Sequence, residues 1–218
     1  MFDIYVINLK EREDRMKKIM ILFKDFNIIR VDAIKYIPGS IGCFLSHQKC
    51  IKIAKEKKLS NIMVIEDDCI DFNENFDINN SKEFTKRLSN IKNTLDNAPL
   101  TSWDIFLGGC GKVFYDNIIG KTKLGSIDLD FAQVSKAYGT HMICYNSSSY
   151  DFFLEYDPIN IKPFIPIDAY WSNSLKALVC VPFIVSQDDG RSDIENRPLS
   201  YKGRIKSSNI CLLDYIKK

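Results

Sequence analysis

The sequence predicts an α/β domain with a mostly parallel central sheet that helices cover. Short apolar runs alternate along the chain with segments whose apolar residues recur at helical spacing, a pattern typical of parallel sheets with crossover helices. Hydrophobic residues make up 45% of the 218 residues and charged residues 27%, which is usual for a globular protein. The chain has neither internal repeats nor a low-complexity linker, so we expect residues 1–218 to form a single domain.

The first half of the chain is expected to contain three strands and two helices. In order, these are a strand at Asp3–Leu9, a helix at 12–26, a strand at Ile28–Val31, a helix from an N-cap at Ser40 to Ala54, and a strand at Asn61–Ile65. Pro38 and Gly39 interrupt the chain just before the second helix. The third strand stops abruptly at three carboxylates, Glu66, Asp67 and Asp68.

The second half has a weaker pattern. Asn80 with Glu83 three positions later predicts a capped helix that Pro99 ends. After it we expect a strand at Asp104–Leu107, a strand at Tyr138–Tyr145 leading into a helix, a helix at Asp168–Leu178, a strand at Val179–Val185 and a polar loop at Gln187–Arg197. Residues 112–136 show no clear period.

Charge and cysteine content exclude several classes of protein. Thirty basic and 28 acidic side chains give a net charge of +2, so we expect no nucleic-acid partner. Seven cysteines without a C-x-x-C pair favour free thiols in a reducing compartment, which predicts a cytoplasmic protein. The opening residues become charged within ten positions, which is typical of neither a signal peptide nor an integral membrane segment.

The acidic triplet is the clearest functional signal. Ligands of open α/β sheets bind at the carboxyl ends of strands, where Glu66, Asp67 and Asp68 are expected to emerge. Carboxylate oxygens suit Mn²⁺ or Mg²⁺, and a cation held by one or two carboxylates can bind a diphosphate. The alternative is an acidic turn that merely caps the next element.

Several separated segments together resemble glycosyltransferase family 25. In order, they are Ile7-Asn8-Leu9 with Asp14-Arg15, the G-x-x-G-C-x-x-S-H segment Gly39–His47, the E-D-D triplet at Glu66, Trp103-Asp104, Gly139-Thr140, Pro166-Ile167-Asp168, and Gln187 with Ser192-Asp193-Ile194. The stretch after Tyr145 departs from the family, which usually carries a basic residue there, and this suggests a diverged acceptor side.

The resemblance implies a GT-A type fold and an enzyme of lipopolysaccharide biosynthesis. It implies metal-dependent, inverting transfer of a hexose, galactose or glucose, from a UDP-sugar to a glycan, a lipid-linked glycan or a hydroxylated protein. Two alternatives remain at this point: a non-catalytic relative that binds nucleotide or glycan, and a metal-dependent phosphohydrolase that uses the same acidic triplet.

The metal and the catalytic base are assigned to four residues. Alternation along a strand turns Glu66 and Asp68 the same way and Asp67 away from them. We expect Asp68 to bind the metal and Glu66 to bind the metal or the donor ribose, and the resemblance adds His141 as a late metal ligand. Asp168 is the expected general base, following two prolines and matching the family's P-I-D aspartate; the alternative is an N-cap for the helix after it.

The remaining expected site residues bind the nucleotide donor. They are Asn8, Arg15, Ser46, His47, Asp67, Gln187 and Ser192. Arg15 can fork onto a phosphate, but a surface ion pair is the alternative. His47 lies within an apolar helical pattern, where a buried core histidine is the alternative to a position near the diphosphate. Asp188 and Asp189 are reserve candidates for the base.

Overall fold

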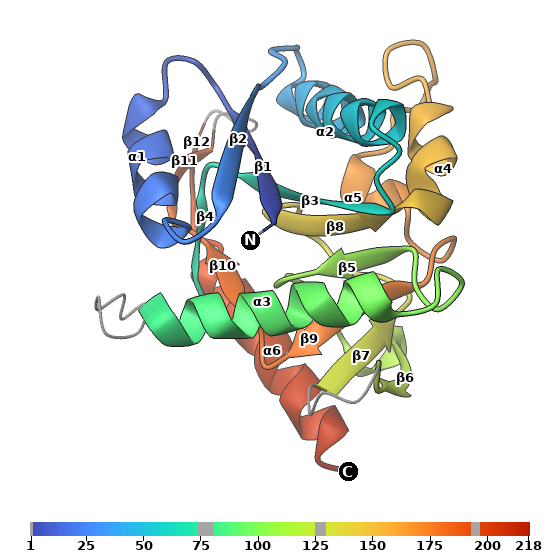
Figure 1. Cartoon of the computed structure of the whole chain (residues 1–218). Helices are drawn as coiled ribbons and strands as arrows, with labels where there is room; N and C mark the ends of the chain where they lie inside the picture. Colours follow the sequence, from blue (N-terminus) through green and yellow to red (C-terminus); the bar gives the residue numbers. More distant parts are fainter. Residues whose placement is uncertain (1, 74–80, 125–129, 193–196) are drawn as a thin grey trace.

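An eight-stranded sheet forms the middle layer of the protein (Figure 1). This computed structural model describes residues 2–73, 81–124, 130–192 and 197–218. Across the sheet the strands follow the order β2 (Asn27–Asp32), β1 (Asp3–Asn8), β3 (Asn61–Glu66), β8 (Met142–Asn146), β5 (Ile105–Leu107), β9 (Ala177–Val181), β7 (Asp130–Val134), β6 (Ile118–Thr122). Two small antiparallel pairs lie beside it, β4 (Cys69–Asp71) with β10 (Val185–Gln187) and β11 (Gly190–Ser192) with β12 (Arg197–Leu199).

The sheet is mixed, so the prediction of a mostly parallel sheet was wrong. Strand β1 pairs in parallel with β2 and β3, and β5 pairs in parallel with β9. The other neighbouring pairs are antiparallel: β3 with β8, β5 with β8, β7 with β9, and β6 with β7. The difference arises because β6 and β7 form in a stretch without visible periodicity, and because β8 runs against both of its neighbours.

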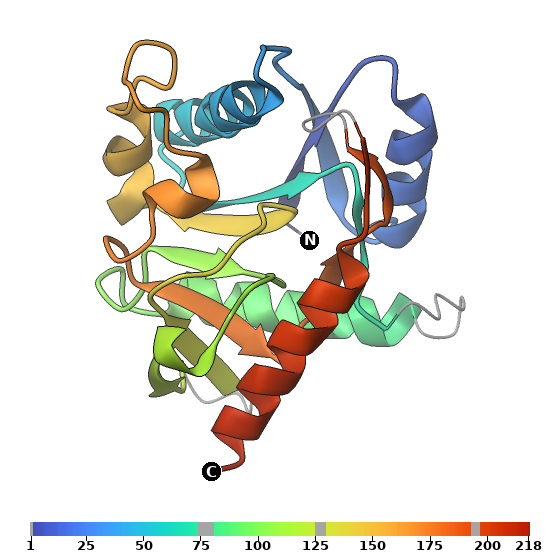
Figure 2. The same cartoon turned by 180° about the vertical axis from the view of Figure 1, so that it is seen from behind.

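Helices cover both faces of the sheet, as expected. Helices α1 (Glu13–Leu22) and α3 (Ser81–Asn97) pack on one face, and α2 (Gly39–Glu56), α4 (Tyr150–Leu154), α5 (Ile167–Tyr170) and α6 (Lys202–Ile216) on the other (Figures 1 and 2). Strand β1 shows the pattern that requires two layers: Ile4 and Val6 join the core under α1 and α3, whereas Tyr5 and Ile7 join the opposite core. Each of these side chains contributes about 1.5–3 kcal/mol by its burial.

Several expected elements have other boundaries. The helix predicted at Asp168–Leu178 ends at Tyr170, because a turn with Asn173 in the left-handed region (φ 62°) redirects the chain and strand β9 begins at Ala177. Ser40 is not an N-cap, because α2 already begins at Gly39. The loop expected at Gln187–Arg197 contains β11 and β12. The N-cap expected at Asn80 lies outside the described residues.

Helix α6 was not predicted, and it crosses the face of the sheet seen in Figure 2. Among the described helices, none combines the length and the apolar character needed to cross a bilayer.

The segments with the expected site residues meet at one end of the strands of the sheet. The carboxyl ends of β1 and β3 meet there, and the amino end of β8 meets them because β8 is antiparallel. The amide of Glu66 donates to the carbonyl oxygen of His141 at 3.1 Å, which ties the end of β3 to the start of β8. Residues 75 positions apart are thereby held side by side.

Candidate active site

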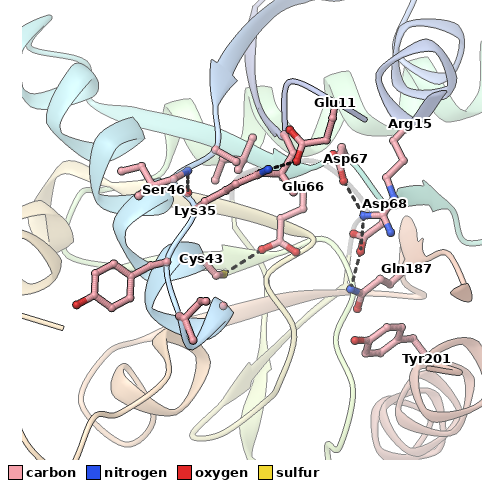
Figure 3. Close-up of a pocket in the computed structure, with 17 residues that line it drawn as sticks. Glu11, Arg15, Lys35, Cys43, Ser46, Glu66, Asp67, Asp68, Gln187 and Tyr201 are labelled. Carbon is pink, nitrogen blue, oxygen red and sulfur yellow. Dashed lines mark hydrogen bonds and ion pairs between the residues drawn. The ribbon is translucent and has the colours of Figure 1, made fainter. Parts of the chain in front are cut away.

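Two adjoining cavities open at this edge of the sheet. The first, of about 730 Å³, lies between the end of β1, the connection from β2 to α2 and the acidic triplet (Figure 3). The second, of about 550 Å³, lies between α2, the residues before β8, and α5 and α6. Four residues line both cavities: Cys43, Glu66, Gln187 and Tyr201. A molecule that fills both cavities would therefore pass Glu66.

The walls of the first cavity differ in character from end to end. The apolar lining residues are Ile7, Leu9, Ala33, Ile34 and Ile37, with Tyr36 beside them, and the ion pair of Glu11 with Lys35 also lines the cavity (Figure 3). The opposite end carries the carboxylates of Glu66, Asp67 and Asp68 and the guanidinium of Arg15. An apolar wall with a few convergent polar groups at one end is the usual construction of a small-molecule site.

Glu66 is held by three donors on a single oxygen. Its Oε1 accepts hydrogen bonds from Thr140 Oγ1 (2.7 Å), His47 Nε2 (3.2 Å) and Cys43 Sγ (3.3 Å). Burial acts to raise the pKa of Glu66, but these hydrogen bonds, chiefly that from His47, hold the pKa below its usual range. Within the described residues Oε2 accepts no hydrogen bond, so this oxygen of an ionised Glu66 remains available to a ligand.

Cys43, His47 and Glu66 also qualify by distance as a metal-ligand set, because their ligand atoms lie within 4.8 Å of one another. The hydrogen bonds among them already account for that proximity. Burial, and next the charge of Glu66, raise the pKa of the Cys43 thiol, which disfavours the thiolate that a metal requires. We therefore interpret the three residues as a polar network that orients Glu66.

His47 is fully buried, and it reaches neither cavity. Its Nδ1 lies 2.9 Å from the hydroxyl of Tyr145, which burial keeps protonated by raising its pKa. An ionised Glu66 can only accept, so Nε2 of His47 carries a proton and donates it to Glu66, and Nδ1 shares its hydrogen bond with the Tyr145 hydroxyl. His47 is thus a buried histidine, as one interpretation of the sequence held. It also positions a carboxylate of the candidate site.

Replacing Tyr145 with Phe tests this hydrogen-bond chain. The ring would keep its packing against Phe153 (centroids 5.0 Å apart), but Nδ1 of His47 would lose its hydrogen-bond partner. We expect a free energy of unfolding about 1–3 kcal/mol lower, the cost of an unsatisfied buried polar atom. Urea denaturation measures the loss. A variant as stable as the wild type would contradict a hydrogen bond between Tyr145 and Nδ1 of His47.

Asp67 does not turn away from Asp68 as expected, because both line the first cavity and lie beside the same guanidinium. Arg15 Nη1 donates to Oδ1 of Asp67 at 2.9 Å and lies 3.8 Å from Oδ2 of Asp68, and Asn8 Nδ2 donates to Oδ2 of Asp67 at 2.7 Å. Burial nevertheless raises the pKa of Asp67 above its ordinary value. The ion-pair alternative for Arg15 is thus present, although the pair is largely buried and Arg15 still lines the first cavity. Asn8 is also buried and lies behind Asp67 rather than in the cavity wall.

Asp68 is the least satisfied of the three acids. Gln187 Nε2 donates to Oδ2 at 3.0 Å and Arg15 pairs with the same oxygen at 3.8 Å, but the buried Oδ1 has no hydrogen-bond partner in the described structure. Burial, and next the charge of Glu66, raise the pKa of Asp68 to about 7. A buried carboxylate oxygen without a donor costs free energy that a bound cation would offset. The donor set at this end of the cavity therefore fits a divalent cation.

His141 is the other residue with unsatisfied polar atoms. Both ring nitrogens are buried and unpartnered in the described part of the chain, and the ring lines the second cavity. Burial lowers its pKa to about 4, so the ring is neutral and one nitrogen has a free lone pair. The structure gives no side-chain contact between His141 and Asp68, and its role as a metal ligand stays a prediction.

Asp168 lies in the second cavity, in the first turn of α5. Helix α5 begins at Ile167, so Asp168 is not the N-cap of the following helix, and that alternative is wrong. Its Oδ2 accepts from the amide of Gly139 at 3.3 Å, and burial raises its pKa above the ordinary value. A half-buried carboxylate with a raised pKa beside a cavity is well suited to accept a proton.

Ser46 stabilises the wall of the first cavity. Its hydroxyl donates to the carbonyl of Gly42 at 2.7 Å and accepts from the amide of Ile34 at 2.8 Å, which fixes the connection from β2 to α2. Gly42 is required for the same contact, because a Cβ there would lie 2.4 Å from the carbonyl oxygen of Ile34. The glycine and serine of the G-C-x-x-S-H motif thus shape the cavity through the backbone.

The remaining expected residues are only partly brought to the site. Ser192 lies in β11, but its side chain is outside the described part of the structure, as are Asp193 and Ile194. Asp189 caps α6 by accepting from the amides of Tyr201 and Lys202. Asp188 forms ion pairs with Lys18 (3.0 Å) and Lys202 (4.0 Å).

Sequence reasoning missed Thr140, Cys43 and Tyr201 as individual site residues. The first two occur within recognised motifs, next to residues that were assigned, and their role appears only when β8 and α2 meet at Glu66. Tyr201 comes from the start of α6, which had no sequence signal. The buried Tyr145 at the end of the polar network had none either.

Comparisons with known proteins give one family. Residues 38–105 match the model of glycosyltransferase family 25 (LPS biosynthesis protein). The match confirms the resemblance for just under a third of the chain, from the start of α2 to β5, and it includes the acidic triplet. Family 25 supports glycosyl transfer as the general type of reaction, with a sugar donor and a glycan acceptor.

No curated protein matches the chain. Among solved structures, "Crystal Structure of A197 from STIV" aligns with 92% of this chain and 93% of that chain, at 7% sequence identity and a TM-score of 0.44. A likeness of that degree carries no argument about the site.

Proposed function

We propose that the protein is a metal-dependent, inverting glycosyltransferase of GT-A type that transfers a hexose, galactose or glucose, from a UDP-sugar to a glycan acceptor. The observation that carries the proposal is the position of Glu66 and Asp68 at the end of β3, in the first cavity, with the second cavity and Asp168 adjoining. The match to family 25 over the same segment supports the type of reaction.

In this proposal the first cavity binds the nucleotide. The uracil and ribose would pack on the apolar wall near Leu9 and Ile34, and the diphosphate would lie at the acidic end. Asp68 would hold Mn²⁺ or Mg²⁺ together with Glu66, and His141 is a further candidate ligand. When bound, such a cation neutralises the charge of the leaving diphosphate. Arg15, Ser46, Asp67 and Gln187 would contribute to the shape and charge of this donor site.

The second cavity would bind the acceptor. An acceptor hydroxyl attacks the anomeric carbon, the bond from that carbon to the diphosphate oxygen breaks, and the configuration inverts. Asp168 takes the proton of the attacking hydroxyl. Its raised pKa favours this, because a base is more effective when its pKa lies closer to the working pH. The acceptor would be a glycan, a lipid-linked glycan or a hydroxylated protein.

Ligand-dependent thermal stability and UDP release test the proposal together. A ligand that binds only the native state raises the melting temperature, so UDP should stabilise the protein and Mn²⁺ should increase the effect. Incubation with UDP-galactose or UDP-glucose should release UDP slowly, and only with the metal. Stabilisation without UDP release even in the presence of glycans would favour the non-catalytic binding relative. Release of UMP and hexose 1-phosphate instead of UDP would favour the phosphohydrolase.

A further inference from the structure

Two cationic side chains line the second cavity. They are Lys112 and Arg204; Tyr138 lines it as well, and none of these three residues lines the first cavity. The Nζ atoms of Lys112 and Lys136 lie 4.9 Å and 5.4 Å from the centre of the Tyr138 ring. One aromatic ring therefore contacts both ammonium groups, and it lines the cavity together with Lys112 and Arg204.

Lys112, Lys136 and Arg204 are not neutralised by an ion pair within the described part of the chain. Within the described residues, the side chains of Lys112, Lys136 and Arg204 form no hydrogen bond and no ion pair. The two carboxylates that face the cavity are Glu66 and Asp168. Glu66 is bonded to the His47 network, and Asp168 accepts from the backbone of Gly139. Lys112 and Arg204 are therefore available to form charge-assisted hydrogen bonds with an anionic ligand in the cavity.

The backbone holds Lys112 in a fixed position. Lys112 adopts a left-handed backbone conformation (φ 56°), which is uncommon for residues other than glycine and asparagine. The preceding residue, Gly111, exchanges two backbone hydrogen bonds with Tyr138, at 2.7 Å and 2.9 Å. An unusual conformation kept in place by its surroundings is a feature of ligand sites.

A second, independent observation points to a ligand in the same cavity. His141 lines it with two buried ring nitrogens that have no partner among the described residues. Buried polar atoms without partners are rare in native proteins, and a bound ligand is one way to satisfy them. Hydroxyl groups of a sugar can donate to one nitrogen of the neutral ring and accept from the other.

We infer that the second cavity binds an acceptor sugar that carries an anionic substituent, a phosphate or a carboxylate, which Lys112 and Arg204 contact. The inference rests on the proposed function in taking the second cavity as the acceptor site. It adds that the acceptor is charged and that two named cations select it. Arginine can form paired hydrogen bonds with either anion, and lysine adds a point charge.

Binding of simple sugars tests the inference without need of the true acceptor. The probes are galactose, galactose 6-phosphate and galacturonic acid, measured by calorimetry at low ionic strength, where charge effects are least screened. The test variant is Lys112→Asn/Arg204→Gln, because Asn tolerates the left-handed backbone. The matched control is Lys206→Gln/Lys217→Gln, which removes two exposed charges on the same helix and its end, outside both cavity linings.

We expect one or both anionic sugars to bind the native protein about ten-fold more tightly than galactose, as one or two charge-assisted contacts would give. The test variant should lose this preference and the control should keep it. Comparing the affinities for galactose 6-phosphate and galacturonic acid identifies the substituent. Equal binding of all three sugars, or a preference that survives in the test variant, would overturn the inference. So would loss of UDP binding in that variant, since the cations would then serve the donor.

The two proposals fail separately. If UDP and Mn²⁺ stabilise the protein and UDP is released but charged and neutral sugars bind alike, the anionic acceptor is wrong and the transferase stands. If the charge preference depends on Lys112 and Arg204 but no nucleotide binds, the second cavity is an anionic-sugar site and the proposed function is wrong.

Discussion

Asp68→Asn is expected to abolish sugar transfer while leaving the protein folded. The change removes the charge that would hold the cation but keeps a side chain of the same size, and Gln187 can still hydrogen-bond to it. Because a metal contributes several kcal/mol to stabilising the leaving group, kcat/KM should fall by about 10³-fold or more. The Mn²⁺-dependent part of the stabilisation by UDP should disappear in the same variant.

Asp71→Asn is the matched control. Asp71 is likewise buried and has a raised pKa, but it accepts a hydrogen bond from the amide of Asn73 and lines neither cavity. Its replacement should leave transfer within a few-fold of the wild type. If Asp68→Asn retained wild-type turnover or the full effect of Mn²⁺ on UDP binding, the acidic triplet would not be the metal site.

Asp168→Asn is expected to separate donor binding from transfer. The amide is nearly the size of the carboxylate and can still accept from the amide of Gly139, but it cannot take up a proton. General base catalysis contributes about 10²–10⁴-fold, so kcat should fall by that amount. The melting-temperature increase caused by UDP with Mn²⁺ should remain, because Asp168 does not line the first cavity.

The same Asp71→Asn variant controls for loss of a buried carboxylate that accepts from a backbone amide. A pH profile adds a second measurement: kcat of the native protein should fall as the pH drops through the raised pKa of Asp168, because the protonated acid is no longer a base. That decline should be absent from the residual activity of Asp168→Asn. Loss of UDP binding together with transfer would show that Asp168 is misplaced as a base.

The elements that were predicted best are those whose apolar residues show a clear period within one segment. Strands β1 and β3 and helices α1 and α2 lie close to their expected positions, and the acidic triplet emerges at the predicted edge. Their apolar residues alternate or repeat because each element is buried on defined faces. The second half was harder, because β6 exposes much of its length and a turn at Asn173 interrupts an apparently helical pattern.

Within the site, residue type was predictable but partnership was not. The location of the carboxylates could be predicted because they directly follow a recognisable strand. The contact of Glu66 with Thr140 depends instead on the insertion of β8 beside β3, and so does the contact of His47 with Tyr145. No local pattern encodes the direction of that strand. Asn8 and His47 were expected at the ligand and lie one layer behind it, because in a small site much of the polar side-chain set holds other side chains in place.

The insertion of β8 between β3 and β5 also sets an order for biosynthesis. A growing polypeptide that has left the ribosome only as far as residue 124 already contains strands β1, β2 and β3, yet the bond from Glu66 to His141 cannot form. Pairing β8 with β3 also requires closure of a long loop, which costs conformational entropy. The contacts of Glu66 with β8 therefore form late, after most of the chain has been synthesised, and truncations before β8 cannot form them.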